Sequence, residues 1–148
     1  MLAAWLGCTL PVPAAVEIDG DLLLGIWSQQ RTRFVANVPA CVYTEDGAAG
    51  GAYRITVSGG ASGTRFAMAN DVGDTIPYRL RWYGSRGTSR REELSPGVPS
   101  RRAYAFRERA ACLDGNVPEL EAQARTRDVS RAPPGVYRDT LLLTVSPI

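Results

Sequence analysis

The stretch that decides the fold is GVYRDTLLLTVSPI, residues 135–148. Along it, side chains alternate between two faces with a period of two, which is typical of a β-strand with one buried face. The sequence ends three residues after Val145, so we expect this to be the last core strand of a small β-sandwich. The residues on its predicted inner face are Tyr137, Asp139, Leu141, Leu143 and Val145.

A second stretch with the same period lies near the other end, in residues 16–26 (VEIDGDLLLGI), where Gly20 interrupts the alternation. Apolar residues on one face of an exposed strand would be poorly placed in water, so we expect this strand to be buried against a protein surface. Two possibilities stay open: the strand inserts into its own domain, or it is donated to a neighbouring copy. The apolar residues concerned are Val16, Ile18, Leu22, Leu24 and Ile26.

Several short strands are predicted between these two ends. The clearest is at 76–82 (IPYRLRW), followed by 53–57 (YRITV) and by weaker strands at 33–42, 66–68, 102–107 and 119–124, with a short helix as the alternative for the last. Residues 84–100 predict a long loop, and arginines on the outer face of 76–82 are expected to be solvated. Seven or eight short strands predict an all-β sandwich. We expect one shared core made of Tyr53, Ile55, Val57, Ile76, Tyr78, Leu80, Trp82, Leu141, Leu143 and Val145.

The length of 148 residues corresponds to one domain, and 45% apolar residues supply enough material for a core. No apolar run reaches the roughly 18 residues of a membrane span. The apolar run at 2–10, followed by small residues, predicts a secretory signal peptide. No Lys or Arg precedes this run, which indicates a clipped start. We therefore divide the chain into a leader (1–15), an N-terminal strand (16–32) and a sandwich domain (33–148).

Removing the leader leaves two cysteines, Cys41 and Cys112. An even number of cysteines in an exported chain favours a disulfide, whereas two free thiols would require a reducing compartment. Closing a loop of this length would stabilise the domain by roughly 4 kcal/mol in the chain-entropy model. We expect the bond near the ends of two neighbouring strands.

Composition also argues against two functional classes. The chain has no histidine, which removes the commonest general base and the commonest transition-metal ligand. We therefore predict no enzyme activity, no cofactor and no metal. Arginines gathered between residues 79 and 109 suit nucleic acid, but the net charge is only +2 and Glu92, Glu93 and Glu108 interrupt the cluster. We expect no nucleic-acid partner.

Four segments, taken in order, resemble the spore coat protein U domain family, which includes subunits of archaic (Csu-type) chaperone–usher pili. The resemblance covers about residues 38–147. Its most specific element is the glycine, tyrosine and aspartate run at 135–139, which precedes the closing apolar strand. The segments are 39–43 (PACVY) with 53–57 (YRITV), 76–82 (IPYRLRW), Cys112 followed by Gly115 and Asn116, and 134–141 (PGVYRDTL).

The resemblance implies an incomplete immunoglobulin-like β-sandwich that is completed by donor-strand addition. A periplasmic pilus chaperone would supply the missing strand first, and the N-terminal strand of another pilus subunit would replace it at an outer-membrane usher. Residues 16–26 would then be the donor strand. The groove and core next to the missing strand would be formed by Tyr137, Leu141, Leu143 and Val145.

The resemblance also implies a location, first in the periplasm and then in an extracellular fimbrium or at the cell surface. Since the length leaves room for one domain, we expect a shaft or adaptor subunit. The alternative is a monomeric secreted coat or adhesion domain that binds a surface or ligand. No transmembrane segment is expected in either case.

Overall fold

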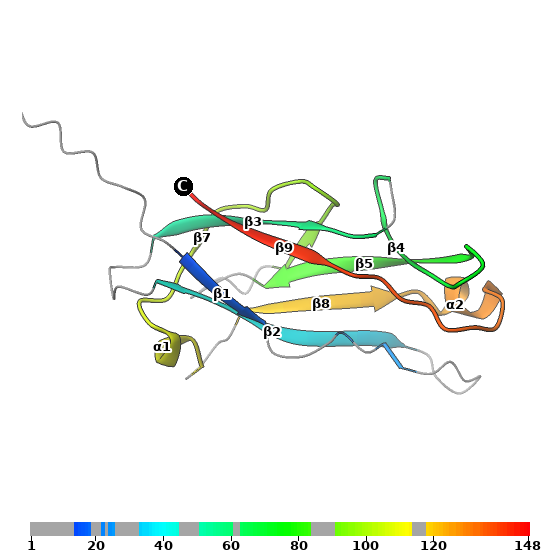
Figure 1. Ribbon diagram of the computed structural model, residues 1–148. Coiled ribbons are helices and arrows are strands. Elements are labelled where there is room, and N and C mark those ends of the chain that lie inside the picture. The colour runs from blue at the N-terminus through cyan, green and yellow to red at the C-terminus, as the bar shows by residue number, and fades with distance from the viewer. Residues whose placement is uncertain are drawn as a thin grey trace, which may run out of the picture.

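Strand β5 (Thr75–Tyr83) lies at the centre of the structure. Its residues alternate between buried and half-buried positions after the exposed Thr75, as the period of two predicts. The computed structural model describes residues 14–18, 22, 24–25, 33–44, 51–60, 63–83, 91–113 and 118–148. Figure 1 shows that most strands run along the long axis of the molecule, with α1 (Arg109–Leu113) and α2 (Thr126–Arg131) at opposite ends.

The larger sheet has six strands in the order β1-β2-β8-β5-β4, with β6 also paired to β5. All of its ladders are antiparallel. Strand β2 has two partners, because residues 34–39 pair with β8 and residues 40–44 pair with β1. The strands are β1 (Ala14–Ile18), β2 (Phe34–Thr44), β8 (Glu119–Ala124), β4 (Phe66–Ala69) and β6 (Arg91–Leu94) in addition to β5.

The smaller sheet consists of β7 (Ala103–Tyr104), β3 (Ala52–Ser58) and β9 (Leu142–Pro147), in the order β7-β3-β9. Its ladders are antiparallel as well. Strand β9 therefore has β3 on one side and no ladder on the other, within the described ranges. Neither helix of the described residues is long and apolar enough to span a membrane.

The core lies between the two sheets and draws side chains from both. The predicted all-β sandwich is thus confirmed, and so is the burial of the seven core residues predicted on β3 and β5. The three predicted core residues of the last strand differ, because Leu141, Leu143 and Val145 are only half-buried. The confirmed residues are Tyr53, Ile55, Val57, Ile76, Tyr78, Leu80 and Trp82.

Three predicted element bounds are wrong. Residues 84–100 are not one loop, since β6 pairs with β5 from Leu80 to Tyr83. The terminal strand begins regular pairing only at Leu142, because residues 137–139 are held by the side-chain and main-chain contacts described below. The strand predicted at 102–107 is reduced to the two residues of β7.

Candidate strand-addition site

Strand β9 is an edge strand of the smaller sheet in the described part of the chain. An edge strand presents a row of unpaired main-chain donors and acceptors, which can pair with a strand from another chain. Strand β1 comes near β9, but its ladder is formed with β2. Figure 1 shows β9 crossing the molecule toward the end where β1 lies.

The register identifies which groups of β9 point toward the open side. Ile55 of β3 directs its main-chain groups away from β9, because its carbonyl accepts a hydrogen bond from the Ser100 N–H (2.8 Å) and its N–H donates to the Ser100 Oγ (3.0 Å). Ile55 lies opposite Val145, and opposite residues in an antiparallel ladder alternate between hydrogen-bonded and non-bonded pairs. The pair of Val57 and Leu143 follows the same pattern. The N–H and C=O groups of Leu143 and Val145 therefore face the open edge.

The inward side chains of β9 are less covered than those of its neighbour. Ile55 and Val57 are 0% and 1% exposed, whereas Leu143 and Val145 opposite them are half-buried while packing against the same core. Leu142 faces outward and is 66% exposed. A strand placed beside β9 would cover this apolar row. Tyr137 and Leu141, the other two residues predicted to line the groove, are also half-buried and pack against the core.

Asp139 anchors the segment that leads into β9. Its Oδ2 accepts a hydrogen bond from the Tyr78 hydroxyl (2.5 Å), and its Oδ1 accepts one from the Gly60 N–H (2.7 Å). Burial and this hydrogen bond raise the pKa of Tyr78, so the hydroxyl stays protonated and donates. A Cβ at Gly59 would lie 2.7 Å from Asp139 Oδ2, so glycine is needed here for the close approach.

The other residues of this run are tied to the turn between β4 and β5. The Tyr137 hydroxyl donates to the Pro133 carbonyl (2.7 Å) and accepts from Asn70 Nδ2 (3.4 Å). Arg138 and Ala69 exchange two main-chain hydrogen bonds of 2.9 Å each. The contacts of residues 137–139 thus fix the position at which β9 enters the smaller sheet.

We expect Asp139→Ala to destabilise the domain by about 1.5–3 kcal/mol, the range for hydrogen bonds to a charged acceptor. The reason is that the Tyr78 hydroxyl, on a residue only 8% exposed, loses its acceptor. Urea unfolding of this variant should be compared with Thr140→Ala, which truncates the next, exposed residue. Equal unfolding midpoints for the two variants would show that Asp139 does not hold this segment.

The N-terminal strand lies on its own domain. In β1, Val16 is opposite Val42 and Ile18 is opposite Ala40. Leu22 and Leu24 are half-buried and pack against the core of the same chain. Ile26 lies outside the described residues, and the side chains of residues 14–18 are not described either. Because β1 begins at Ala14, the predicted boundary between leader and N-terminal strand falls inside it.

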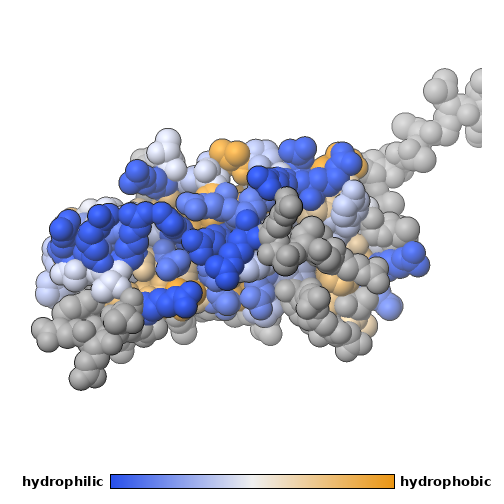
Figure 2. Space-filling view, turned by 180° about the vertical axis from the view of Figure 1, so that it is seen from behind, coloured by the Kyte–Doolittle hydropathy of each residue, from blue (hydrophilic) through white to orange (hydrophobic). Residues whose placement is uncertain are grey.

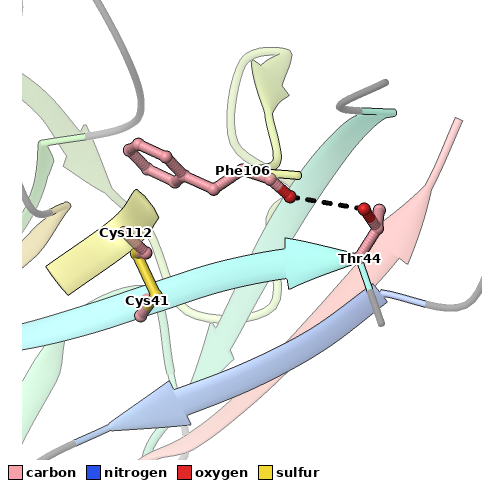
Figure 3. Close-up of a disulfide and its surroundings, with 4 residues drawn as sticks. All are labelled: Cys41, Thr44, Phe106 and Cys112. Atoms are coloured by element: carbon pink, nitrogen blue, oxygen red, sulfur yellow. Dashed lines mark hydrogen bonds between the residues drawn. A yellow bond between two sulfur atoms is a disulfide. The ribbon is translucent and has the colours of Figure 1, made fainter. Parts of the chain in front are cut away.

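The predicted cysteine pair is joined in the structure, with 5.9 Å between the Cα atoms of Cys41 and Cys112 (Figure 3). Both residues are buried, at 3% and 0% exposure. The predicted position between two strand ends is wrong, because Cys41 lies within β2 and Cys112 lies in α1. The chain before α1 runs beside β2, where the Thr44 N–H donates to the Phe106 carbonyl (2.9 Å) and the Thr44 hydroxyl contacts the same oxygen at 3.4 Å.

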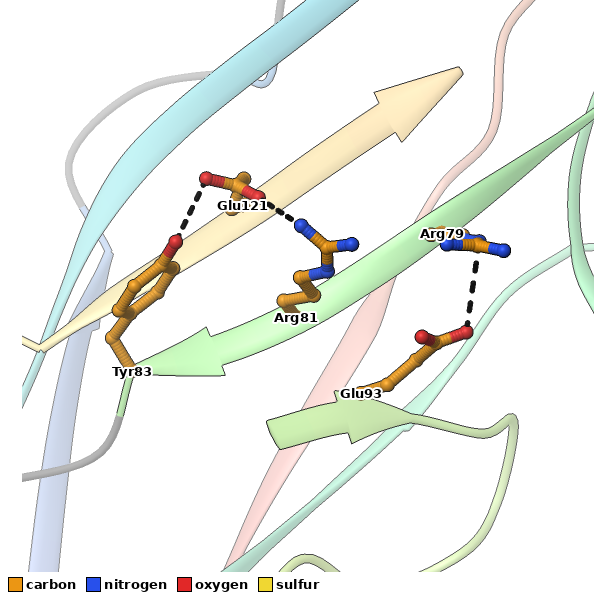
Figure 4. A network of polar contacts seen from close by, with 5 residues as sticks. All are labelled: Arg79, Arg81, Tyr83, Glu93 and Glu121. Atoms are coloured by element: carbon orange, nitrogen blue, oxygen red, sulfur yellow. Dashed lines mark hydrogen bonds and ion pairs between the residues drawn. The ribbon is translucent and has the colours of Figure 1, made fainter. Parts of the chain in front are cut away.

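A buried polar cluster on the outer face of the larger sheet was not predicted. Glu121 of β8 is 5% exposed. Its Oε1 lies 3.2 Å from Arg81 Nη1, and its Oε2 accepts a hydrogen bond from the Tyr83 hydroxyl at 2.9 Å (Figure 4). Burial and the hydrogen bond to Glu121 raise the pKa of Tyr83. The prediction of solvated arginines is wrong for Arg81, whose side chain is 20% exposed.

We expect Glu121→Ala to cost about 3 kcal/mol of unfolding free energy, the lower end of the range for removing one partner of a buried pair, because Arg81 keeps some solvent contact. The matched control is Glu93→Ala. Glu93 pairs with Arg79 at 3.9 Å with both side chains about half exposed, so its loss should change stability by less than about 1 kcal/mol. Denaturant melts would measure the unfolding free energy of both variants. Similar losses would contradict the claim that Glu121 is part of a buried, stabilising cluster.

Comparison with known proteins supports the fold. No protein-family model matches the chain, and no curated protein matches it either. A chain from a solved chaperone–tip adhesin complex of CFA/I fimbriae biogenesis is similar, with a TM-score of 0.61 and 12% sequence identity. The match covers 90% of this chain and 42% of that chain, so this chain spans less than half of that length. The resemblance to spore coat protein U domains stays a prediction, and the sandwich described above is a fold that also occurs in a fimbrial chaperone–adhesin complex.

Proposed function

We propose that this chain is a structural subunit, in the shaft or as an adaptor, of an extracellular chaperone–usher pilus. The observation that carries the proposal is the open edge of β9, where the main-chain groups of Leu143 and Val145 face outward beside a half-buried apolar row. A strand added at this edge would satisfy the main-chain groups and cover the apolar side chains at once. The likeness to a chain of a fimbrial chaperone–adhesin complex supports the proposal.

The proposed assembly is an exchange of strands, without catalysis or a cofactor. A periplasmic chaperone occupies the edge of β9 first. At the outer-membrane usher, the N-terminal strand of the next subunit replaces the chaperone, with Val16, Ile18, Leu22, Leu24 and Ile26 as its apolar face. The pairing of β1 with β2 within one chain must open for this. Donation is therefore favourable only if the strand buries more surface beside β9 of the neighbouring subunit than it exposes when it leaves β2 of its own chain.

A second candidate function is favoured by one observation. Strand β1 pairs with β2 of its own chain, and Leu22 and Leu24 pack against their own core. A monomeric secreted coat or adhesion domain would keep this arrangement permanently. The two candidates differ in whether residues 16–26 leave their own domain.

Deleting residues 16–26 is expected to remove the donor and leave the acceptor edge intact. Co-expressed with its chaperone, the shortened chain should still form a chaperone complex but no SDS-resistant ladder without heating. The double variant Leu22→Asp, Leu24→Asp should behave in the same way, because a carboxylate without a partner is costly to bury in an apolar site. Leu23→Asp is the control, since the period of two places it on the other face.

A ladder formed by wild type and by the Leu23→Asp variant, but by neither of the other two, would support the proposal. The monomeric alternative would replace it if wild type formed no ladder and remained a stable monomer in the absence of any chaperone.

A further inference from the structure

A hollow lies on the larger sheet beside Arg79 of β5. Strands β4 and β6 both pair with the same side of β5, but the β4 ladder ends at Tyr78 and the β6 ladder begins at Leu80. Neither strand therefore covers this side of Arg79. The segment before β4 and the segment after β6 both turn away from β5 at this point. The resulting hollow has a volume of about 300 Å³, at the lower end of the range of small-ligand sites.

Cationic side chains outnumber acidic ones in the lining of this hollow. The charged residues that line it are Arg65, Arg79, Arg125 and Arg127, together with Glu93 and Asp128. Figure 2, seen from behind the view of Figure 1, shows hydrophilic side chains gathered at the end of the molecule that carries α2, the helix that includes Arg127 and Asp128. Four positive charges face two negative ones, so the hollow carries a positive excess.

The ion pairs within the hollow do not neutralise this positive charge. Arg79 Nε lies 3.9 Å from Glu93 Oε1, and the two side chains are 42% and 58% exposed, so the pair holds the guanidinium only weakly. Arg127 contacts Asp128 at 3.3 Å. Within the described ranges, Arg65 and Arg125 have no acidic partner. Several guanidinium N–H donors are thus available to a ligand.

Part of the remaining wall of the hollow is apolar and rigid. Pro77, Leu94 and Pro96 form this part, and neutral polar side chains are added by Thr64, Ser95 and Gln123. Proline has a fixed backbone angle and loses little entropy when a ligand packs on it. Such a wall suits the C–H face of a small ring, while the guanidinium groups suit a carboxylate, which they can bind with two parallel hydrogen bonds.

We propose that this hollow binds an acidic sugar unit, with the carboxylate held by Arg79 and Arg125 and the ring against Pro77 and Pro96. The site lies on the larger sheet, whereas the strand-addition edge belongs to the smaller sheet. The proposal therefore does not depend on polymerisation. It would give the protein a surface contact with acidic glycans.

The test is a titration of the purified full chain with glucuronate, followed by NMR chemical shifts of backbone amides. We expect saturable shifts around Arg79, Leu94 and Arg125, and at least about tenfold weaker binding of glucose, since one charge-assisted contact accounts for about a factor of ten. The double variant Arg79→Gln, Arg125→Gln should weaken glucuronate binding at least about tenfold. Raising the salt concentration should weaken it as well.

Arg54→Gln is the matched control, because Arg54 is an exposed arginine on β3 of the other sheet. Unchanged binding in this variant, together with unchanged melting of all variants, would support a specific site. An equal loss of glucuronate binding in the Arg79→Gln, Arg125→Gln double variant and in Arg54→Gln would show diffuse charge attraction and overturn the proposal. Sulfate binding as tightly as glucuronate, glucose binding equally well, or no saturable shift would overturn it too.

Discussion

Replacing Leu143 with aspartate is expected to convert the SDS-resistant ladder of wild type into monomers. Leu143 lies on the inward face of β9 next to the open edge, where an added strand would enclose its side chain. A carboxylate enclosed there without a partner costs several kcal/mol, because it loses its hydration. Leu142→Asp is the control, since its side chain points outward and is 66% exposed. It should leave the ladder unchanged.

Mixing two defective chains makes this test sharper. The chain that lacks residues 16–26 keeps its acceptor edge, and the Leu143→Asp chain keeps its donor strand. Each should fail to polymerise alone, but together they should form one-to-one dimers and nothing longer. Because both variants must fold for this to happen, the dimer also serves as the folding control. Long ladders from the mixture, or no complex between two chains with unchanged circular dichroism, would contradict strand addition at β9.

Removal of the disulfide is expected to have the second large effect, on stability. Cys41 and Cys112 are separated by 71 positions in sequence, and a cross-link over such a loop contributes roughly 4 kcal/mol in the chain-entropy model. Domains of this size are stable by only about 5–15 kcal/mol, so much of the total would be lost. The double variant Cys41→Ala, Cys112→Ala is suitable, because both positions are buried and serine would add an unpaired hydroxyl.

Urea unfolding with intrinsic tryptophan fluorescence would measure the loss. With a slope of about 2 kcal/mol per molar urea, the midpoint should fall by about 2 M. The unmodified protein measured with and without reductant is the control, and its reduced form should approach the double variant. A midpoint shift below about 0.5 M would show that the bond does not restrain the unfolded chain, contrary to the expectation.

The alternation of side chains was sufficient to predict much of the sandwich. In residues 76–82 every second residue is apolar, and Ile76, Leu80 and Trp82 are buried as expected. The reason is that successive side chains of a strand point to opposite faces, so the alternation fixes which residues are buried when one face is solvent-exposed. The cysteine pair could be predicted from parity, but α1 could not, because residues 109–113 are too few to show helical periodicity.

Features that depend on register between distant strands could not be predicted. Glu121 and Arg81 read as solvated charges when each strand is considered alone, and only their position opposite one another in the ladder brings them together. The same is true of Asp139, which alternation placed on the inner face of the last strand without indicating a partner. In the structure its carboxylate is held by Tyr78 and Gly60. Strand β6 was missed because its sequence, REEL, has no apolar alternation.

Amide hydrogen exchange at β9 tests the central claim most directly. The chain that lacks residues 16–26 would be measured alone and after addition of a synthetic peptide with the sequence of residues 16–26. The account predicts that the amides of Leu143 and Val145 exchange rapidly at first and become protected by the peptide. The Thr144 amide, which faces β3, should be protected in both states, and a peptide with Leu22→Asp and Leu24→Asp should change nothing. Protection of Leu143 and Val145 before any peptide is added, or rapid exchange of both at saturating peptide, would contradict the claim that β9 is the edge at which a second chain adds its strand.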